Sequence, residues 1–70
     1  MENKGKLWID SDPDGFGNGS RGYWWIIASG DLQIHHKMPF RKASLAVSAG
    51  KTMAKRFGIK LDGKFRRGQP

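Results

Sequence analysis

The chain has 70 residues, no Cys and a formal net charge of +7, so it has room for one modest core and no disulfide or thiolate zinc site. Apolar residues make up 37% and charged residues 27% of the sequence, a balance that favours a folded domain over a disordered segment. We find no signal sequence and no apolar run of membrane-spanning length. We therefore expect a single cytoplasmic domain over residues 1–70, with an ordered core at about 6–61 and a basic C-terminal tail over 60–70.

The positive charge is concentrated in the second half of the chain. Ten of the 13 Lys and Arg residues follow His36, and the only acid in that half is Asp62. Such a concentration is the usual footprint of binding to a phosphate backbone, although a basic surface also serves solubility alone. The charge therefore makes a polyanion the expected partner, with nucleic acid first among them.

The first half of the chain predicts two strands. Residues 6–10 form a short β-type run that ends in a loop over 11–22, where Pro, Gly and Asn supply turn geometry. Residues 22–29 are aromatic and β-branched, which favours a central strand, and residues 29–31 supply a tight turn.

Residues 32–38 alternate between apolar and polar side chains, which predicts a third strand. One face of that strand carries Leu32, Ile34, His36 and Met38, and the other carries Gln33, His35 and Lys37. Pro39 cannot donate to a ladder, so the strand ends near Phe40 or lies at an edge of the sheet.

A helix is predicted over residues 42–57. Its apolar positions recur at three- and four-residue spacing, and they are Ala43, Ala46, Val47, Gly50, Met53, Ala54 and Phe57. Gly58 then provides a left-handed cap with Ile59 as its hydrophobic contact. Gly50 costs about 1 kcal/mol relative to Ala in a helix interior, and a close approach to the sheet is the expected compensation.

Together these elements predict a two-layer α+β fold, in which one C-terminal helix packs on a three-stranded antiparallel sheet in the order β-β-β-α. The Asp62-Gly63 pair, flanked by residues 59–61 and 64–66, is in addition compatible with a short C-terminal hairpin.

Strand alternation places at least one Trp away from the helix. Tyr23, Trp25 and Ile27 point one way and Trp24 the other, and Trp8 faces outward if its neighbours pack under the helix. Exposed aromatic rings among bases can stack on nucleobases. Burial of the Trp rings in the small core is an equally open reading, because Trp is highly buried on average.

The basic residues of the helix region and tail are expected to contact phosphates, which fix position without reading sequence. They are Arg41, Lys42, Lys51, Lys55, Arg56, Lys60, Lys64, Arg66 and Arg67. Because Lys51 and Lys55 are four residues apart, they share a helix face, and Arg56 is expected to extend the stripe. Alternatively, the helix bases form only the solvent-exposed face of an amphipathic helix and contact no phosphate.

Nothing in the sequence indicates an enzyme, a cofactor or a metal site. Asp10, Asp12 and Asp14 match the start of a calcium loop, but Arg21 stands where a bidentate Glu is expected. Adjacent His residues in a strand diverge and do not ligate one metal easily. We find no nucleophile paired with a base and an orienting group.

Three stretches of the chain carry a family resemblance: residues 22–27, residues 32–37 and the entry to the helix at 39–43. They resemble the AP2-type domain shared by plant transcription factors and the arm-binding N-terminal domains of phage integrases. The resemblance covers about residues 6–59 and implies a three-stranded sheet, backed by one helix, that inserts its open face into the DNA major groove. By position it implicates Trp8, Arg21, Trp24, Gln33, His35 and Lys37 in DNA contact.

Two other resemblances leave alternatives open. The chain looks like a group of short bacterial proteins of unknown function with Trp-rich strands, which implies fold alone, and Arg41-Lys42-Ala43 is similar to the helix entry of double-stranded-RNA-binding domains. We expect a small nucleic-acid-binding protein of phage or mobile-element type that binds duplex DNA as a monomer or dimer. The alternatives are a small protein that binds and modulates an acidic surface of a host protein, and an RNA-binding module.

Overall fold

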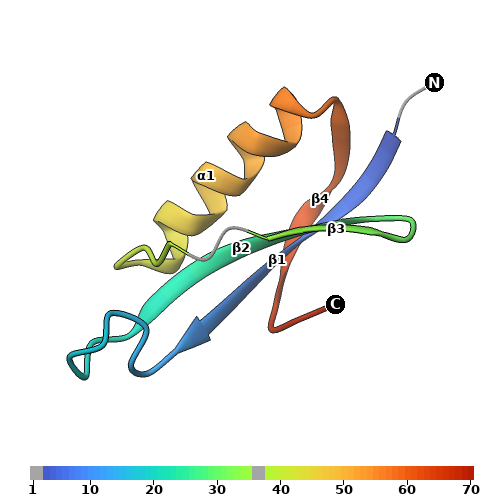
Figure 1. Ribbon diagram of the computed structural model, residues 1–70. Helices are drawn as coiled ribbons and strands as arrows, with labels where there is room; N and C mark the ends of the chain where they lie inside the picture. The colour runs from blue at the N-terminus through green and yellow to red at the C-terminus, as the bar shows by residue number, and fades with distance from the viewer. Residues whose placement is uncertain (1–2, 36–37) are drawn as a thin grey trace.

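The computed structural model describes residues 3–35 and 38–70, which form one helix on one face of a four-stranded sheet (Figure 1). The strands are β1 (Asn3–Asp12), β2 (Gly22–Ser29), β3 (Leu32–His35) and β4 (Ile59–Arg67), and the helix is α1 (Ala43–Arg56). Their order in the sheet is β3-β2-β1-β4. The predicted α+β class with a single helix is confirmed.

The sheet differs from the predicted one at its C-terminal edge. The first three strands form the expected antiparallel meander, but β4 adds to β1 in parallel, and no hairpin forms at Asp62-Gly63. The register shifts between Gly5 and Leu7 of β1, and the extra residues of β4 include Gly63, whose φ is +96°. The Asp-Gly pair therefore forms a bulge within one strand, because a bulge and a tight turn both use the positive φ that Gly permits.

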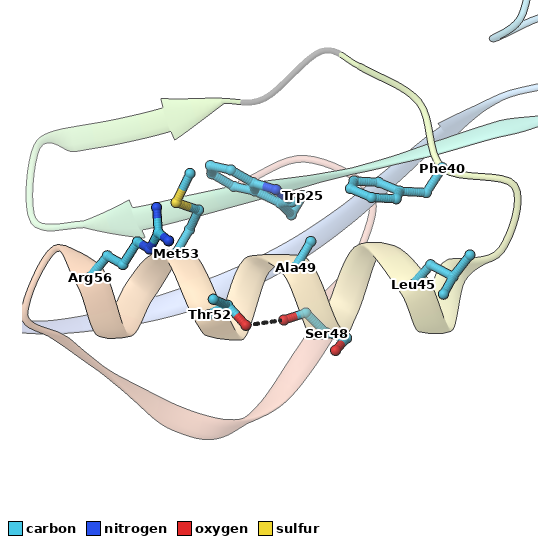
Figure 2. A pocket seen from close by; sticks show the side chains of 8 residues that line it. All are labelled: Trp25, Phe40, Leu45, Ser48, Ala49, Thr52, Met53 and Arg56. Atoms are coloured by element: carbon cyan, nitrogen blue, oxygen red, sulfur yellow. Dashed lines mark hydrogen bonds between the residues drawn. The ribbon is translucent and has the colours of Figure 1, made fainter.

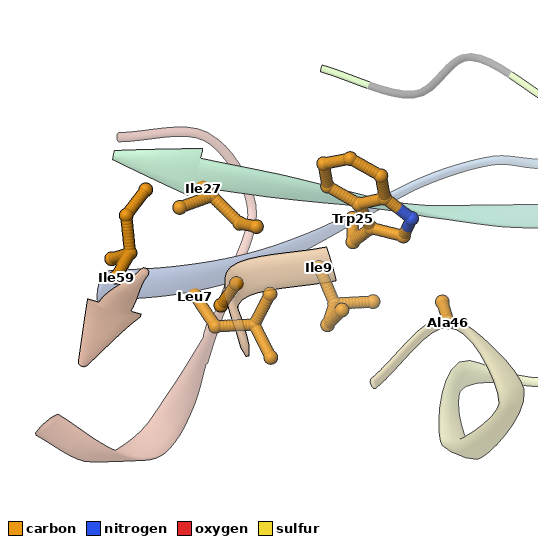
Figure 3. Close-up of a cluster of buried hydrophobic side chains, with 7 residues drawn as sticks. Leu7, Ile9, Trp25, Ile27, Ala46 and Ile59 are labelled. Atoms are coloured by element: carbon orange, nitrogen blue, oxygen red, sulfur yellow. The ribbon is translucent and has the colours of Figure 1, made fainter. Parts of the chain in front are cut away.

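The main core lies between α1 and the sheet. Leu7 and Ile9 of β1 and Trp25 and Ile27 of β2 are buried against the helix (Figure 3). The other buried members of this cluster are Ala46, Ala54 and Ile59. Since side chains alternate along a strand, the residues between these, Trp8, Trp24 and Ile26, lie on the opposite face.

Small residues let α1 approach the sheet closely. A Cβ on Gly50 would stand 2.6 Å from Leu7 Cδ1 and 3.0 Å from Trp25 Cβ, which accounts for a glycine in the middle of the helix. The helix ends as expected, with Gly58 at φ +69° and its N–H donating to the Lys55 carbonyl. Lys55 and Arg56 in the last turn complement the helix dipole.

Phe40, before α1, lies at the edge of the sheet. Phe40 pairs with Tyr23 of β2 through two backbone hydrogen bonds of 2.7 and 2.9 Å. Pro39, directly before it, fits this edge position because it has no N–H to donate. Within residues 3–35 and 38–70, no helix is both long and apolar enough to cross a bilayer.

Candidate nucleic-acid interface

The face of the sheet away from α1, called the open face below, carries a row of side chains that crosses all four strands. Trp8 of β1 is the register partner of Arg66 on β4 and of Ile26 on β2, and Ile26 in turn pairs with His35 on β3. Ile26 is fully buried although it faces away from the helix. The open face therefore has a small apolar centre of its own, with Trp8 half-buried over it.

Arg66 and Asp62 form an ion pair beside Trp8. The Arg66 guanidinium donates to both carboxylate oxygens of Asp62, at 2.8 and 3.2 Å, and lies 6.0 Å from the centre of the Trp8 ring. This hydrogen bonding from Arg66 holds the pKa of Asp62 below its usual 3.8, and the charge of Lys6 acts in the same direction. Two basic residues of the open face thus act on its Asp62 carboxylate.

Residues 68–70 fold back toward the open face, where the end of the chain turns after β4 (Figure 1). The Gly68 N–H donates to the Ile9 carbonyl at 2.9 Å, and Gln69 Nε2 donates to Asp10 Oδ2 at 2.7 Å. The Ser11 N–H donates to the other oxygen of Asp10. Both oxygens of this carboxylate are therefore engaged within the protein.

One end of the open face is basic. Lys4 of β1 and Lys60 of β4 are register partners, and Lys6 follows Lys4 on the same face of the same strand. Lys4 and Lys6 line a hollow of about 510 Å³ together with Trp8, Gln33 and Asp62, the carboxylate that is paired with Arg66.

The basic surface continues around the β4 edge toward the helix. Lys64 of β4 and Lys51 of α1 line one hollow of about 160 Å³ on the helix side of the sheet. We call the five lysines of this surface the lysine belt: Lys4, Lys6, Lys60, Lys64 and Lys51. All five are exposed.

The other end of the open face is acidic. Asp12 and Asp14 line a hollow of about 430 Å³ with Trp24, His35 and Gln69. Two of the residues expected to contact DNA, Trp24 and His35, therefore lie beside carboxylates that repel phosphate. The open face therefore carries an excess of lysines at the end where β1 begins, with Asp62 among them, and Asp12 and Asp14 at the end where β1 stops.

The remaining predicted residues are dispersed over the molecule. Arg21 donates to Ser11 Oγ at 2.9 Å, and Arg41 lies 5.0 Å from the centre of the Phe16 ring. Arg67 lines a hollow with Tyr23 and so lies on the helix side of the sheet. Lys37 falls outside the described residues.

The helix cations are divided between its two flanks. Lys51 lies on the flank toward β4, where Lys55, four residues later, shares its direction. Arg56 lines a groove on the flank toward β3. Lys42 precedes the first turn and is exposed. The expected single stripe of Lys51, Lys55 and Arg56 is thus split across the helix.

Two residues of the belt, Lys4 and Lys6, were not predicted. The sequence does contain the information needed to predict them. Side chains two residues apart in a strand point to the same face, so Lys4 and Lys6 are expected on the face that carries Trp8. The expected strand started at residue 6, whereas β1 begins at Asn3.

The carboxylates of Asp12 and Asp14 accept hydrogen bonds from nearby backbone N–H groups. Asp12 Oδ1 accepts the Asp14 N–H at 2.8 Å, and Asp14 Oδ1 accepts the Gly19 N–H at 2.6 Å. These contacts are typical of Asx turns. Within the described parts of the chain, no three His, Cys, Asp or Glu residues gather where they could hold a metal ion.

Comparison of the chain with models of known families, with curated proteins and with solved structures gave no match.

Proposed function

We propose that this protein binds nucleic acid, duplex DNA first, by placing the lysine belt against the phosphate backbone. The observation that supports this proposal is the separation of charge: five lysines from three elements gather around one edge and one end of the sheet, and the aspartates of the loop lie at the other end. A local excess of one sign of charge attracts a polyanion and speeds the encounter.

The strand register argues against a purely structural role for these lysines. Lysines on an edge strand such as β4 prevent unwanted pairing with another sheet, which accounts for Lys60 and Lys64. That role does not extend to Lys4 and Lys6, because β1 is paired on both sides. Placing Lys4 directly opposite Lys60 also costs stability, since like charges on facing positions repel. A bound phosphate would relieve this repulsion.

Groups suited to contacts beyond phosphate lie next to the belt. Gln33, whose Oε1 lies 3.2 Å from His35 Nε2, keeps an amide N–H that can donate to a base edge, and the Trp8 ring forms part of the same hollow. Asp62 also lines this hollow, and its pairing with Arg66 offsets its negative charge there. The belt then supplies most of the affinity, and Gln33 and Trp8 supply contacts that are sensitive to the shape of the ligand.

Fluorescence anisotropy with labelled duplex DNA, duplex RNA and single-stranded DNA at two salt concentrations tests this proposal. We expect duplex DNA to bind most tightly and every complex to weaken steeply with salt, by about 0.9 in log K per log unit of salt for each phosphate contacted. Tighter binding of RNA would assign the belt to RNA. Absence of binding to every nucleic acid at low salt would reject the proposal and favour an acidic protein surface as the partner.

A further inference from the structure

Asp62 is the one acid in the second half of the chain, and it lies among cations on the open face. It lines the hollow of about 510 Å³ with Lys4 and Lys6, and hydrogen bonding from Arg66 together with the charge of Lys6 lowers its pKa. A carboxylate at this position reduces the attraction of the surface for a polyanion. Its presence there therefore needs a physical reason.

The contact between Arg66 and Asp62 has the geometry by which arginine binds phosphate. Two guanidinium nitrogens, Nη1 and Nη2, donate to the two carboxylate oxygens at 3.2 and 2.8 Å. The same planar fork of donors pairs with two oxygens of a phosphate group. The Asp62 carboxylate thus occupies the edge of the guanidinium that a phosphate would use, and the two anions cannot hold that edge together.

The surroundings of Arg66 suit a phosphate as well as a carboxylate. Arg66 is the register partner of Trp8, and its guanidinium lies 6.0 Å from the centre of that ring. Lys4 and Lys6 line the hollow that Trp8 and Asp62 share. A phosphate on Arg66 would therefore lie close to two lysines of the belt, and one strand of nucleic acid could contact all three cations.

Arg56 shows that such pairing is not general among the arginines of this chain. It lines an apolar groove along α1 together with Met53 (Figure 2). Within the part of the chain that the structure describes, no carboxylate lines that groove. Arg66 differs from Arg56 in having both an internal carboxylate and lysines around it.

The pair on the open face is placed where it can exchange partners. The side chains of Arg66 and Asp62 are 36% and 40% exposed, so solvent and ligands reach both. Asp62 also precedes Gly63 in the bulge of β4, where the ladder to β1 is interrupted. Exposed ion pairs of this kind are weak, and a ligand that gains other contacts can separate them.

We propose that Asp62 is an internal competitor for phosphate: it holds Arg66 in the free protein, and a backbone phosphate of nucleic acid replaces it on Arg66 in the complex. This inference rests on the proposed function, because it adds one phosphate subsite to the same surface. An isolated phosphate ion gains little by displacing Asp62, since one ion pair replaces another. A long polyanion also reaches the lysine belt, so the exchange favours extended ligands.

A cycle of single and double variants tests the exchange, with fluorescence anisotropy on labelled duplex DNA at low salt. Asp62→Asn should tighten binding roughly two- to fivefold, because Arg66 no longer has to leave an exposed ion pair. In the Arg66→Gln background the same change should have a much smaller effect. Asp31→Asn removes an exposed acid next to Gly30 of the same hollow, and its effect should be equally small with and without Arg66.

The outcomes separate this inference from the proposed function. An equal gain from Asp62→Asn with and without Arg66, or weaker binding by the folded Asp62→Asn variant, would overturn the exchange while DNA binding by the wild type upholds the proposed function. If neither the wild type nor Asp62→Asn binds DNA, the proposed function is rejected, and the same cycle with inorganic polyphosphate in a calorimeter tests the exchange alone. No gain in affinity for polyphosphate would then overturn it too. Circular dichroism establishes that each variant is folded.

Discussion

Gly50 of α1 lies directly above Leu7 of β1, so close that a Cβ at residue 50 would stand 2.6 Å from Leu7 Cδ1. Leu7 is fully buried, and it therefore has little freedom to move aside. The contact fixes the distance between the two layers and explains why a residue unfavourable to helices occupies the middle of α1.

Replacing this glycine tests the contact. We expect Gly50→Ala to destabilise the fold by up to about 2 kcal/mol, because an overpacking cost of about 1–3 kcal/mol outweighs the gain of about 1 kcal/mol in helix propensity. Urea denaturation followed by circular dichroism measures the change, with the exposed Ser44→Ala as a helix control expected to be nearly neutral. A stabilised Gly50→Ala variant would show that the layers are not in close contact.

The two adjacent tryptophans of β2 should respond differently to truncation. Trp25 is 3% exposed in the core, and its replacement by Ala should cost about 3–5 kcal/mol, which is enough to abolish cooperative unfolding in a domain of this size. Trp24 is half-buried on the open face, and Trp24→Ala should retain a cooperative transition. Thermal unfolding of both variants decides the point, and loss of the transition in Trp24→Ala would assign that ring to the core.

The ion pair between Arg66 and Asp62 predicts a dependence of stability on pH. Since the hydrogen bond lowers the pKa of Asp62 in the folded state, its carboxylate contributes stability above the ordinary value of 3.8, and the contribution is lost as pH falls through the lower folded value. The difference in urea midpoint between the wild type and Asp62→Asn should therefore be largest above about pH 5 and vanish in strong acid. The effect will be small because the pair is exposed.

Asp31→Asn, which removes an exposed acid from the turn between β2 and β3, is the control for this pH series. It should not reproduce the pH dependence of Asp62→Asn. A constant difference between the wild type and Asp62→Asn at every pH would contradict a role for the ionised carboxylate.

Local patterns in the sequence were sufficient for much of the fold. The spacing of apolar residues and Gly58 predicted the helix to within one residue at each end, and alternation predicted that at least one Trp lies away from it. These features depend on residues near each other in the chain. The parallel pairing of β4 with β1 joins segments more than 50 residues apart, and no local pattern encodes it. The Asp62-Gly63 pair was moreover ambiguous, since its backbone conformation suits both a turn and a bulge.

The candidate site was harder to predict than the fold. Counting charges located the bases but not their positions, which depend on the fourth strand: Lys60 meets Lys4 only because β4 lies beside β1. Likewise, the resemblance implicated Trp24 and His35 in DNA contact, whereas the structure places them beside Asp12 and Asp14. Both carboxylates accept backbone N–H groups of residues 14–19, and composition does not reveal such local hydrogen bonds.

The salt dependence of DNA binding tests the lysine belt most directly. Each neutralised phosphate contact contributes about 0.9 to the slope of log K against log salt, so the double variant Lys60→Gln with Lys64→Gln should weaken binding and reduce that slope by nearly 2. Arg41→Gln with Lys42→Gln removes the same charge from exposed positions outside the belt and should leave the slope nearly unchanged. An unchanged slope in the first variant, or an equal reduction in both, would contradict a DNA contact centred on the belt.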